Sequence, residues 1–345
     1  MAKVISKPDS TQVPRIAVIV PAYGVARWLG EALDSLVAQD FTQWECVVID
    51  DGAPDDVAGA VAPYLNDSRI RFISTANYGV SAARNTAIAA SSAPLIALLD
   101  GDDRFCPHYL STMVGLLEGD PDIRLATCNA RIFGAVPRER LCFEGKQGSG
   151  DGMRGTLADV LDRSFGVYIG STFRREDFDS AGGFDTTMAH AEDFDLWVRL
   201  MQLGGHARYT DTLLGEYRVR PNSASASSNR MLIGNIRVYE KARSTLPGDA
   251  PEQPLLQRLI AESEDDLAFE HAIDRVIEGD TRNGLAELQR ARSRVEGMVW
   301  TLSFTLWRIL PSLARPMLAW RRKAHRRGNQ SASIIGALLP RAFHP

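Results

Sequence analysis

Short aliphatic and β-branched runs alternate with longer segments of helical spacing from residue 15 to about residue 131. This alternation is typical of βα units, whose strands form a mostly parallel sheet with helices packed on its faces. The apolar runs predict four strands, at residues 16–20, 46–50, 70–74 and 95–99. Helical spacing of leucines predicts a helix over 26–39, and an alanine-rich segment predicts a shorter helix over 80–90. The sequence therefore predicts an α/β fold.

Polar loops follow three of these strands: PAYG the first, DDGAPDD the second and DGDDRF the fourth. Because ligands bind beyond the carboxyl ends of parallel strands, we expect these loops to meet at one crevice. The last loop carries three carboxylates within four positions, those of Asp100, Asp102 and Asp103. Acids this close raise one another's pKa unless a cation or hydrogen-bond donors compensate. A solvated turn is the simpler interpretation, since Asp and Gly are common loop residues.

Composition narrows the functional class. The 345 residues are 45% hydrophobic and 24% charged, as in folded globular proteins. A net charge of −4 argues against a general nucleic-acid binder, and we expect no nucleic-acid partner. The four cysteines show neither a CxxC pair nor zinc-ligand spacing, so we expect a reduced, cytoplasmic chain. We also expect no secretory signal and no membrane-spanning segment, because no apolar run is long enough.

Several segments resemble family 2 glycosyltransferases of the GT-A fold. They are VIVPAYG, CVVIDDGAPDD, NYGVSAARNTAI and LIALLDGDD, followed by GSTFRREDFDSAGGFD and AEDFDLWVRLMQLG. The resemblance extends over residues 15 to about 225. It implies a Rossmann-like, mostly parallel sheet flanked by helices, and inverting transfer of a sugar from a nucleotide-sugar donor, with a UDP-sugar as the expected donor. A glycan or lipid-linked acceptor in cell-envelope or polysaccharide biosynthesis is expected.

The expected organisation has four parts. An N-terminal tail occupies 1–14, a GT-A domain 15–228, an α-helical extension 229–296, and an amphipathic basic helix with its tail 297–345.

The resemblance implies roles for the acidic cluster and for the loop after the first strand. Asp100, Asp102 and Asp103 match the family's DxD-type motif, with Asp102 and Asp103 expected to bind a metal ion and Asp100 to face the donor. Carboxylates suit Mg²⁺ or Mn²⁺, and the sequence does not distinguish the two. Pro21 and Tyr23 match the loop under the nucleoside, where the Tyr23 ring would stack on the base.

Further donor contacts are implied at Asp51, Arg84 and Asn85. Asp51 would hydrogen-bond the base, whereas Asp50 is expected to cap the end of its strand. Arg84 and Asn85 lie near the start of a predicted helix, whose N-terminus would favour the donor phosphates. The alternative for these two residues is a solvated helix face.

Arg220 departs from the family pattern. It stands in GEYRVRPNSAS where the family carries a metal-binding histidine. Arginine cannot ligate a cation, but it could clamp a diphosphate through two parallel hydrogen bonds. We therefore expect a looser metal dependence, with His190 as a candidate substitute ligand.

Asp193 is the expected catalytic base. In HAEDFDLWVRL the apolar residues occupy one side of a predicted helix and leave the acids at its N-terminal end, where negative charge is stabilised. Acids are also common in the first turn of ordinary helices. The resemblance assigns the base to Asp193 and places Gly170 and Glu192 on the acceptor side.

Residues 297–327 combine tryptophans with a basic cluster. Seven arginines and lysines and no acid lie between residues 308 and 327. A polar stripe at helical spacing predicts an amphipathic helix that binds the inner face of the cell membrane as a peripheral anchor. The alternative is a helix that covers an apolar surface of the catalytic domain and is followed by a charged, solvated tail.

Two other functions stay open. A metal-dependent sugar-phosphate phosphohydrolase could use the acidic cluster, and a non-catalytic nucleotide-sugar-binding protein would be compatible with Arg220. Phosphate release without an acceptor would indicate the first, and tight UDP binding without turnover the second.

Overall fold

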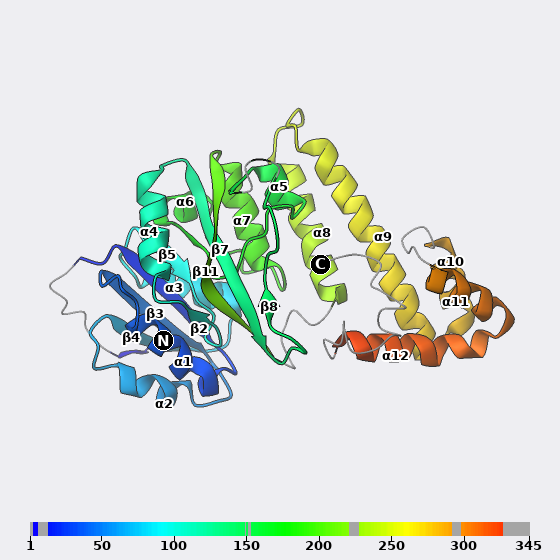
Figure 1. Cartoon of the computed structure of the whole chain (residues 1–345), viewed down its shortest axis with the longest axis horizontal. Coiled ribbons are helices and arrows are strands. Elements are labelled where there is room, and N and C mark those ends of the chain that lie inside the picture. The colour runs from blue at the N-terminus through cyan, green and yellow to red at the C-terminus, as the bar shows by residue number, and fades with distance from the viewer. Residues whose placement is uncertain are drawn as a thin grey trace. The chain divides into compact units, whose positions relative to one another are not determined.

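The computed structural model describes residues 3–5, 13–148, 150, 153–220, 228–291 and 298–326. The chain forms two compact units, the first made of residues 1–133 with 140–218 and the second of 134–139 with 219–345 (Figure 1). The prediction of an α/β fold with C-terminal helices is confirmed.

A parallel core of four strands forms the centre of the first unit, in the order β4-β3-β2-β5. The strands are β2 (Ile16–Ala22), β3 (Trp44–Asp51), β4 (Ile70–Thr75) and β5 (Leu95–Leu98), within two residues of the predicted bounds. Antiparallel strands extend this core on both sides and curl the sheet. These are β1 (Lys3–Ile5), β6 (Arg104–Phe105), β7 (Ile123–Gly134), β10 (Thr172–Arg174) and β11 (His206–Val219), with short β8 (Arg140–Leu141) on β7 and β9 (Arg154–Gly155) on β11.

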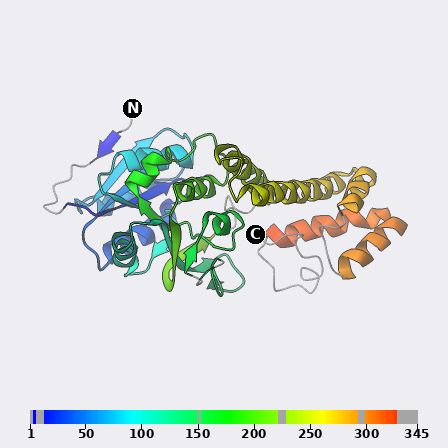
Figure 2. The same cartoon turned by 90° about the horizontal axis from the view of Figure 1, so that it is seen from above.

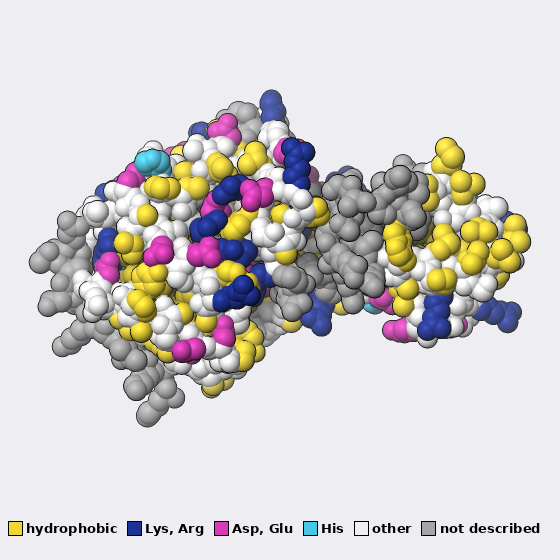
Figure 3. All heavy atoms as spheres, turned by 60° about the horizontal axis from the view of Figure 1, so that its bottom comes forward, with side chains coloured by type: hydrophobic (Ala, Val, Ile, Leu, Met, Phe, Trp, Pro, Cys, Tyr) yellow, Lys and Arg dark blue, Asp and Glu magenta, His cyan; other side chains and the backbone are white. Residues whose placement is uncertain are grey.

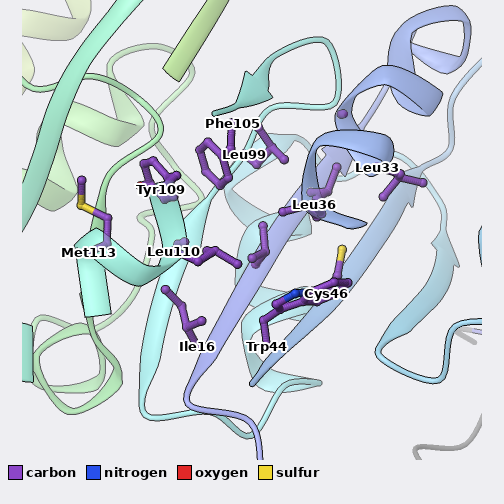
Figure 4. Close-up of a cluster of buried hydrophobic side chains, with 14 of the residues drawn as sticks. Ile16, Leu33, Leu36, Trp44, Cys46, Leu99, Phe105, Tyr109, Leu110 and Met113 are labelled. Carbon is purple, nitrogen blue, oxygen red and sulfur yellow. The ribbon is translucent and has the colours of Figure 1, made fainter. Parts of the chain in front are cut away.

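Helices cover both faces of the sheet. They are α1 (Ala26–Val37), α2 (Val57–Val61), α3 (Val80–Ala89), α4 (Tyr109–Gly119), α5 (Leu157–Leu161), α6 (Arg175–Ser180) and α7 (Glu192–Gln202), with a short 3₁₀ turn η1 (Ala62–Tyr64) after α2. The long α1 follows from Leu29, Leu33 and Leu36, which recur every three or four residues and are fully buried. They pack with Trp44 and with residues of α4 such as Tyr109 (Figure 4).

The second unit consists of helices. They are α8 (Ser228–Thr245), α9 (Gln253–Glu278), α10 (Thr281–Arg290), α11 (Met298–Ile309) and α12 (Ala314–Arg326), with a 3₁₀ turn η4 (Pro311–Leu313) between the last two. The long α9 ends at Gly279, whose φ of 115° is favourable only for glycine, and α10 begins after Asp280. Figures 1 and 2 both show α10 and α12 beside the C-terminal half of α9.

The prediction of a single amphipathic helix over 297–327 is wrong. Pro311 lacks a backbone N–H, and α11 ends just before it, so that two separate helices form. Trp300, Phe304 and Trp307 are at most 4% exposed and pack in the core of this unit rather than facing out. This tryptophan face packs on α9 and its neighbours within the helical unit, so neither the membrane nor the catalytic domain is its partner.

Part of the predicted basic cluster is also neutralised. The guanidinium of Arg322 lies 3.0 Å from Glu270 and 2.7 Å from Asp274, and the buried Arg321 lies 3.4 Å from Glu270. Among the residues that the structure describes, no helix is both long and apolar enough to cross a bilayer.

Candidate active site

The loops that follow β2 and β3 are joined by hydrogen bonds. The Asp55 carboxylate, in the loop after β3, accepts the backbone N–H of Gly24 at 3.0 Å and that of Ala26 at 2.7 Å. Both donors lie within three residues after Tyr23, where the chain enters α1. Two of the three loops expected to meet at the carboxyl ends of the strands are therefore in contact, and Asp55 is a positioning residue that sequence reasoning missed.

Asp50 and Asp51 at the end of β3 have different surroundings. Asp50 accepts hydrogen bonds from the Ala53 N–H at 2.8 Å and the Ser74 hydroxyl at 3.0 Å, as expected of a strand-end cap. Asp51 accepts the N–H groups of Tyr78 and Gly79 at 2.8 and 2.9 Å. It thereby fixes the loop that leads into α3.

Exposed aromatic rings stand at this edge of the sheet. Tyr23, after β2, is 52% exposed, and Tyr78, between β4 and α3, is 73% exposed. An exposed ring on a loop held by carboxylates is available to stack on a planar base. Pro21 is the second-last residue of strand β2 and is partly exposed. Tyr78 was not singled out, although it is the tyrosine of the NYG segment.

Arg84 on α3 is the centre of an ion-pair chain. Its side chain is buried, and its two terminal nitrogens lie 2.9 Å from Asp100 and 2.9 Å from Glu192. The guanidinium also lies over the Phe184 ring, 5.3 Å from its centroid. Arg84 therefore joins the acidic loop after β5 to the start of α7, segments that are about a hundred residues apart in the sequence. Arg84 was expected either at the helix N-terminus or on a solvated helix face. It lies instead at the fifth residue of α3 and is buried.

Asn85 holds the loop before α7. Its amide nitrogen donates to the Phe184 carbonyl at 2.8 Å, and its amide oxygen accepts the Phe184 N–H at 2.9 Å. Both ends of the side chain are thus engaged with one backbone unit. This geometry favours a positioning role for Asn85 over the donor contact that the resemblance implies.

Asp193 lies in the first turn of α7, as its position in the sequence predicts. The helix begins after Ala191, which adopts the left-handed conformation with a φ of 58°. Burial and, next to it, the charge of Glu192 raise the pKa of Asp193 to about 6, against the opposing charge of Arg84. A carboxylate with a pKa near neutrality is well suited to accept a proton.

Asp103 is the most deeply buried acid of the DGDD loop. Asp103 is 1% exposed, and it accepts the backbone N–H of Arg218 at 2.7 Å and, at 3.5 Å, the Tyr168 hydroxyl. Burial raises the pKa of Asp103 well above its ordinary value, and the charges of Asp100 and Asp102 add to this. The three acids are therefore close enough to repel one another. A shared cation would relieve that repulsion.

Arg218 braces this loop. Its guanidinium donates to the Asp102 carbonyl at 2.8 Å and pairs with Glu31 of α1 at 2.6 Å. Sequence reasoning concentrated on Arg220 and missed Arg218, two positions earlier in the same GEYRVRPNSAS segment. Arg220 itself belongs to the second unit, and its part in donor binding stays a prediction.

Gly170 lies beneath the acidic loop. Its carbonyl accepts the Tyr109 hydroxyl, and a Cβ at this position would stand 2.4 Å from the Tyr168 ring. A side chain at Gly215 would meet the same ring at 2.4 Å. The two glycines thus make room for Tyr168, whose hydroxyl faces Asp103.

No group of three or more His, Cys, Asp or Glu side chains within the described ranges could by itself hold a metal ion. Mg²⁺ commonly takes only one or two carboxylates from the protein and completes its shell with water and substrate phosphates. The crowded carboxylates of the DGDD loop are compatible with that arrangement. The role of His190 as a substitute metal ligand stays a prediction.

Sequence comparisons place the chain among known transferases. The family model described as "Glycosyl transferase family 2" matches residues 17–180. The succinoglycan biosynthesis protein ExoU of Rhizobium meliloti is 30% identical over 256 residues, which cover 68% of this chain and 70% of that protein. The uncharacterized glycosyltransferase EpsJ of Bacillus subtilis is 40% identical over 92 residues, and the match spans only 27% of its length.

Solved structures share the fold. TarS of S. aureus in complex with UDP-GlcNAc superimposes with a TM-score of 0.60 at 17% identity, covering 91% of this chain and 89% of that one. The mannosyltransferase PcManGT of Pyrobaculum calidifontis, in complex with GDP-Man and Mn²⁺, gives a TM-score of 0.59 at 20% identity and covers 94% and 89%. The fold is thus that of GT-A glycosyltransferases, as the resemblance implies. Taken with the sequence matches, this shows that the chain belongs to glycosyl transferase family 2 and is a glycosyltransferase.

Proposed function

We propose that this glycosyltransferase moves a sugar, with inversion, from a nucleotide-sugar donor to a glycan or lipid-linked acceptor in cell-envelope or polysaccharide biosynthesis. The observation that carries the proposal is the chain Asp100–Arg84–Glu192 beside Asp193. It ties the loop that would meet the donor to the helix start that would meet the acceptor.

The donor side is supported by the loops at the carboxyl ends of β2, β3 and β5. Tyr23 would stack on the base, over Pro21, and Asp51 would face the nucleoside while it fixes the Tyr78 loop. TarS binds UDP and UDP-GlcNAc, and PcManGT binds GDP-Man, which supports a nucleotide-sugar donor with UDP as the first candidate. Asp100 would lie toward the diphosphate, and contact of Arg220 with the donor stays a prediction.

Asp102 and Asp103 would hold a divalent cation, Mg²⁺ or Mn²⁺, since their repulsion falls when they share one. When bound, such an ion stabilises the negative charge of a departing diphosphate. The Mn²⁺ in the PcManGT complex supports this assignment for a protein of the same fold. With arginine at position 220 we expect partial activity in EDTA.

On the acceptor side, Asp193 would accept the proton of the acceptor hydroxyl. The hydroxyl oxygen attacks the anomeric carbon, a new C–O bond forms, and the bond to the diphosphate oxygen breaks with its electron pair on the nucleoside diphosphate. Attack opposite the leaving group inverts the configuration. Glu192 would help to orient the acceptor, and the backbone at Gly170 would line its approach.

The acceptor class rests on relatives. ExoU is named for succinoglycan biosynthesis, and a chondroitin synthase of Escherichia coli is 26% identical over 195 residues. A lipid-linked acceptor would require the enzyme to work at a membrane surface, so we propose peripheral attachment at the inner, cytoplasmic face of the cell membrane.

The test measures nucleoside diphosphate release from UDP- and GDP-sugars, with and without oligosaccharide acceptors and Mn²⁺. Asp193→Asn should reduce transfer by about 10²- to 10⁴-fold and retain donor binding. Asp179→Asn, at an exposed acid on α6, is the matched control. Near-normal transfer by Asp193→Asn would remove Asp193 from the role. Inorganic phosphate release without an acceptor would instead indicate the phosphohydrolase.

A further inference from the structure

A pocket of about 710 Å³ opens between α10 and α11 of the second unit. Leu285 of α10 faces Phe304 and Trp307 of α11 across it, so that its floor is aliphatic and aromatic. Pockets of this size hold small amphiphiles or drug-sized ligands. Nothing in the proposed transfer reaction uses it.

The charged residues that line this pocket, among those the structure describes, are Arg282 and Arg308. Both side chains are exposed. Within the part of the chain that the structure describes, neither arginine has an ion-pair partner, and Glu287 of α10 pairs with Arg275 at 3.2 Å. Two exposed guanidiniums beside an apolar floor fit a ligand with an anionic head and an apolar tail.

A separate exposed apolar face runs along α11, on the side of the helix away from Phe304 and Trp307. Met298, Leu302 and Ile309 are 76%, 60% and 74% exposed and recur at helical spacing. Leu310 and Leu313 extend the face across the break between α11 and α12, at 49% and 39% exposure. Figure 3 shows hydrophobic side chains gathered on this unit with Lys and Arg beside them. Single exposed aliphatic residues are ordinary, but a contiguous set with cations at its margin indicates a binding surface.

We propose that this face, defined by Arg282, Arg308, Leu302 and Ile309, docks on an anionic lipid bilayer. Arg282 and Arg308 hold a lipid phosphate at the pocket mouth, and an acyl chain enters over Phe304 and Trp307. Leu302 and Ile309 enter the interface between headgroups and chains. Exposed apolar side chains next to arginines match an anionic bilayer, which offers both an apolar interior and a negatively charged surface.

The proposal deepens the membrane attachment suggested above and changes the residues responsible for it. The tryptophans of 297–327 form the core of the unit, while the aliphatic side chains on the other side of α11 meet the lipid. It does not depend on the transfer chemistry, since vesicle binding needs neither donor nor acceptor.

The test is cosedimentation of the full chain with phosphatidylcholine vesicles that contain or lack phosphatidylglycerol. Binding should require phosphatidylglycerol. The variant R282A/R308A should bind about 25-fold more weakly, since each cation near an anionic surface contributes roughly fivefold. The matched control R243A/R258A removes two exposed arginines of α8 and α9 and should retain binding more closely.

A second variant, L302S/I309S, keeps the charge and removes apolar contacts at exposed positions, where the fold does not depend on them. Its binding should fall at least tenfold at equal phosphatidylglycerol content. Solution transfer to a soluble acceptor should be unchanged in both variants, which separates failure of this proposal from failure of the proposed function. Equal binding of all variants would overturn the docking surface. If the chain does not bind vesicles but forms a dimer, and L302S/I309S is monomeric, the face would instead be a self-association surface.

Discussion

Removing the charge of Glu192 should move the acidic limb of the pH–rate profile. Burial and the adjacent Glu192 carboxylate raise the pKa of Asp193 to about 6, and a base works only when deprotonated. The kcat/KM of the wild-type enzyme should therefore rise with pH through about 6. In Glu192→Gln the neighbouring negative charge is gone, while the positive charge of Arg84 stays.

The size of the change follows from Coulomb's law. Two unit charges about 6 Å apart, at an effective dielectric constant of about 40, interact by about 1.4 kcal/mol, which is about one pH unit. The limb of Glu192→Gln should therefore lie near pH 5, still above the ordinary aspartate value of 3.8 because burial persists. The assay is initial rates of nucleoside diphosphate release at limiting donor, from pH 4.5 to 8.5, with Glu176→Gln on α6 as the exposed control. A limb that stays at 6, or moves upward, would refute the electrostatic assignment.

Three further outcomes can be measured. Asp193→Asn should raise the free energy of unfolding by about 1 to 3 kcal/mol at pH 8 and hardly at pH 4 in denaturant titrations, because a folded-state pKa raised from 3.8 to about 6 makes ionisation costly above pH 6. Gly170→Ala should lower the melting temperature, since its Cβ would stand 2.4 Å from the Tyr168 ring; unchanged melting would show that the ring can move. Asp55→Ala removes two hydrogen bonds from the loop after Tyr23 and should weaken donor binding by about 1 to 3 kcal/mol, measured by calorimetry. The free energy of unfolding should fall by less than this.

The sheet was predictable because its signal is local. Strands β2, β3 and β5 each contain a run of buried aliphatic residues, and α1 repeats leucine every three or four residues. The order of polar loops after the strands then predicted which edge of the sheet these loops share. Chain order and periodicity are sufficient for such features, since a parallel sheet places the carboxyl ends of its strands at one edge.

Contacts between distant segments were not predictable. Arg84 pairs with Glu192, 108 positions later, and Asn85 clamps Phe184, 99 positions later. No periodicity encodes these pairs. The same limit explains the error at 297–327, where helical spacing cannot tell a face that meets lipid from one that meets α9. Pro311 was the one local signal that the segment would break.

Two features near Asp193 cost free energy of folding. Ala191 adopts a left-handed conformation that costs of order 1 kcal/mol for a residue with a side chain, and Arg84 is charged yet 2% exposed. A buried ion pair is seldom more stabilising than well-packed apolar residues, so Arg84 is poorly explained by stability. It is explained if the distance between the Asp100 loop and the start of α7 must stay fixed, because a guanidinium with one carboxylate at each end spans that gap in a single geometry. Since a displacement transfers a sugar between two substrates in one step, the separation of donor and acceptor groups is the quantity such an enzyme has to hold constant.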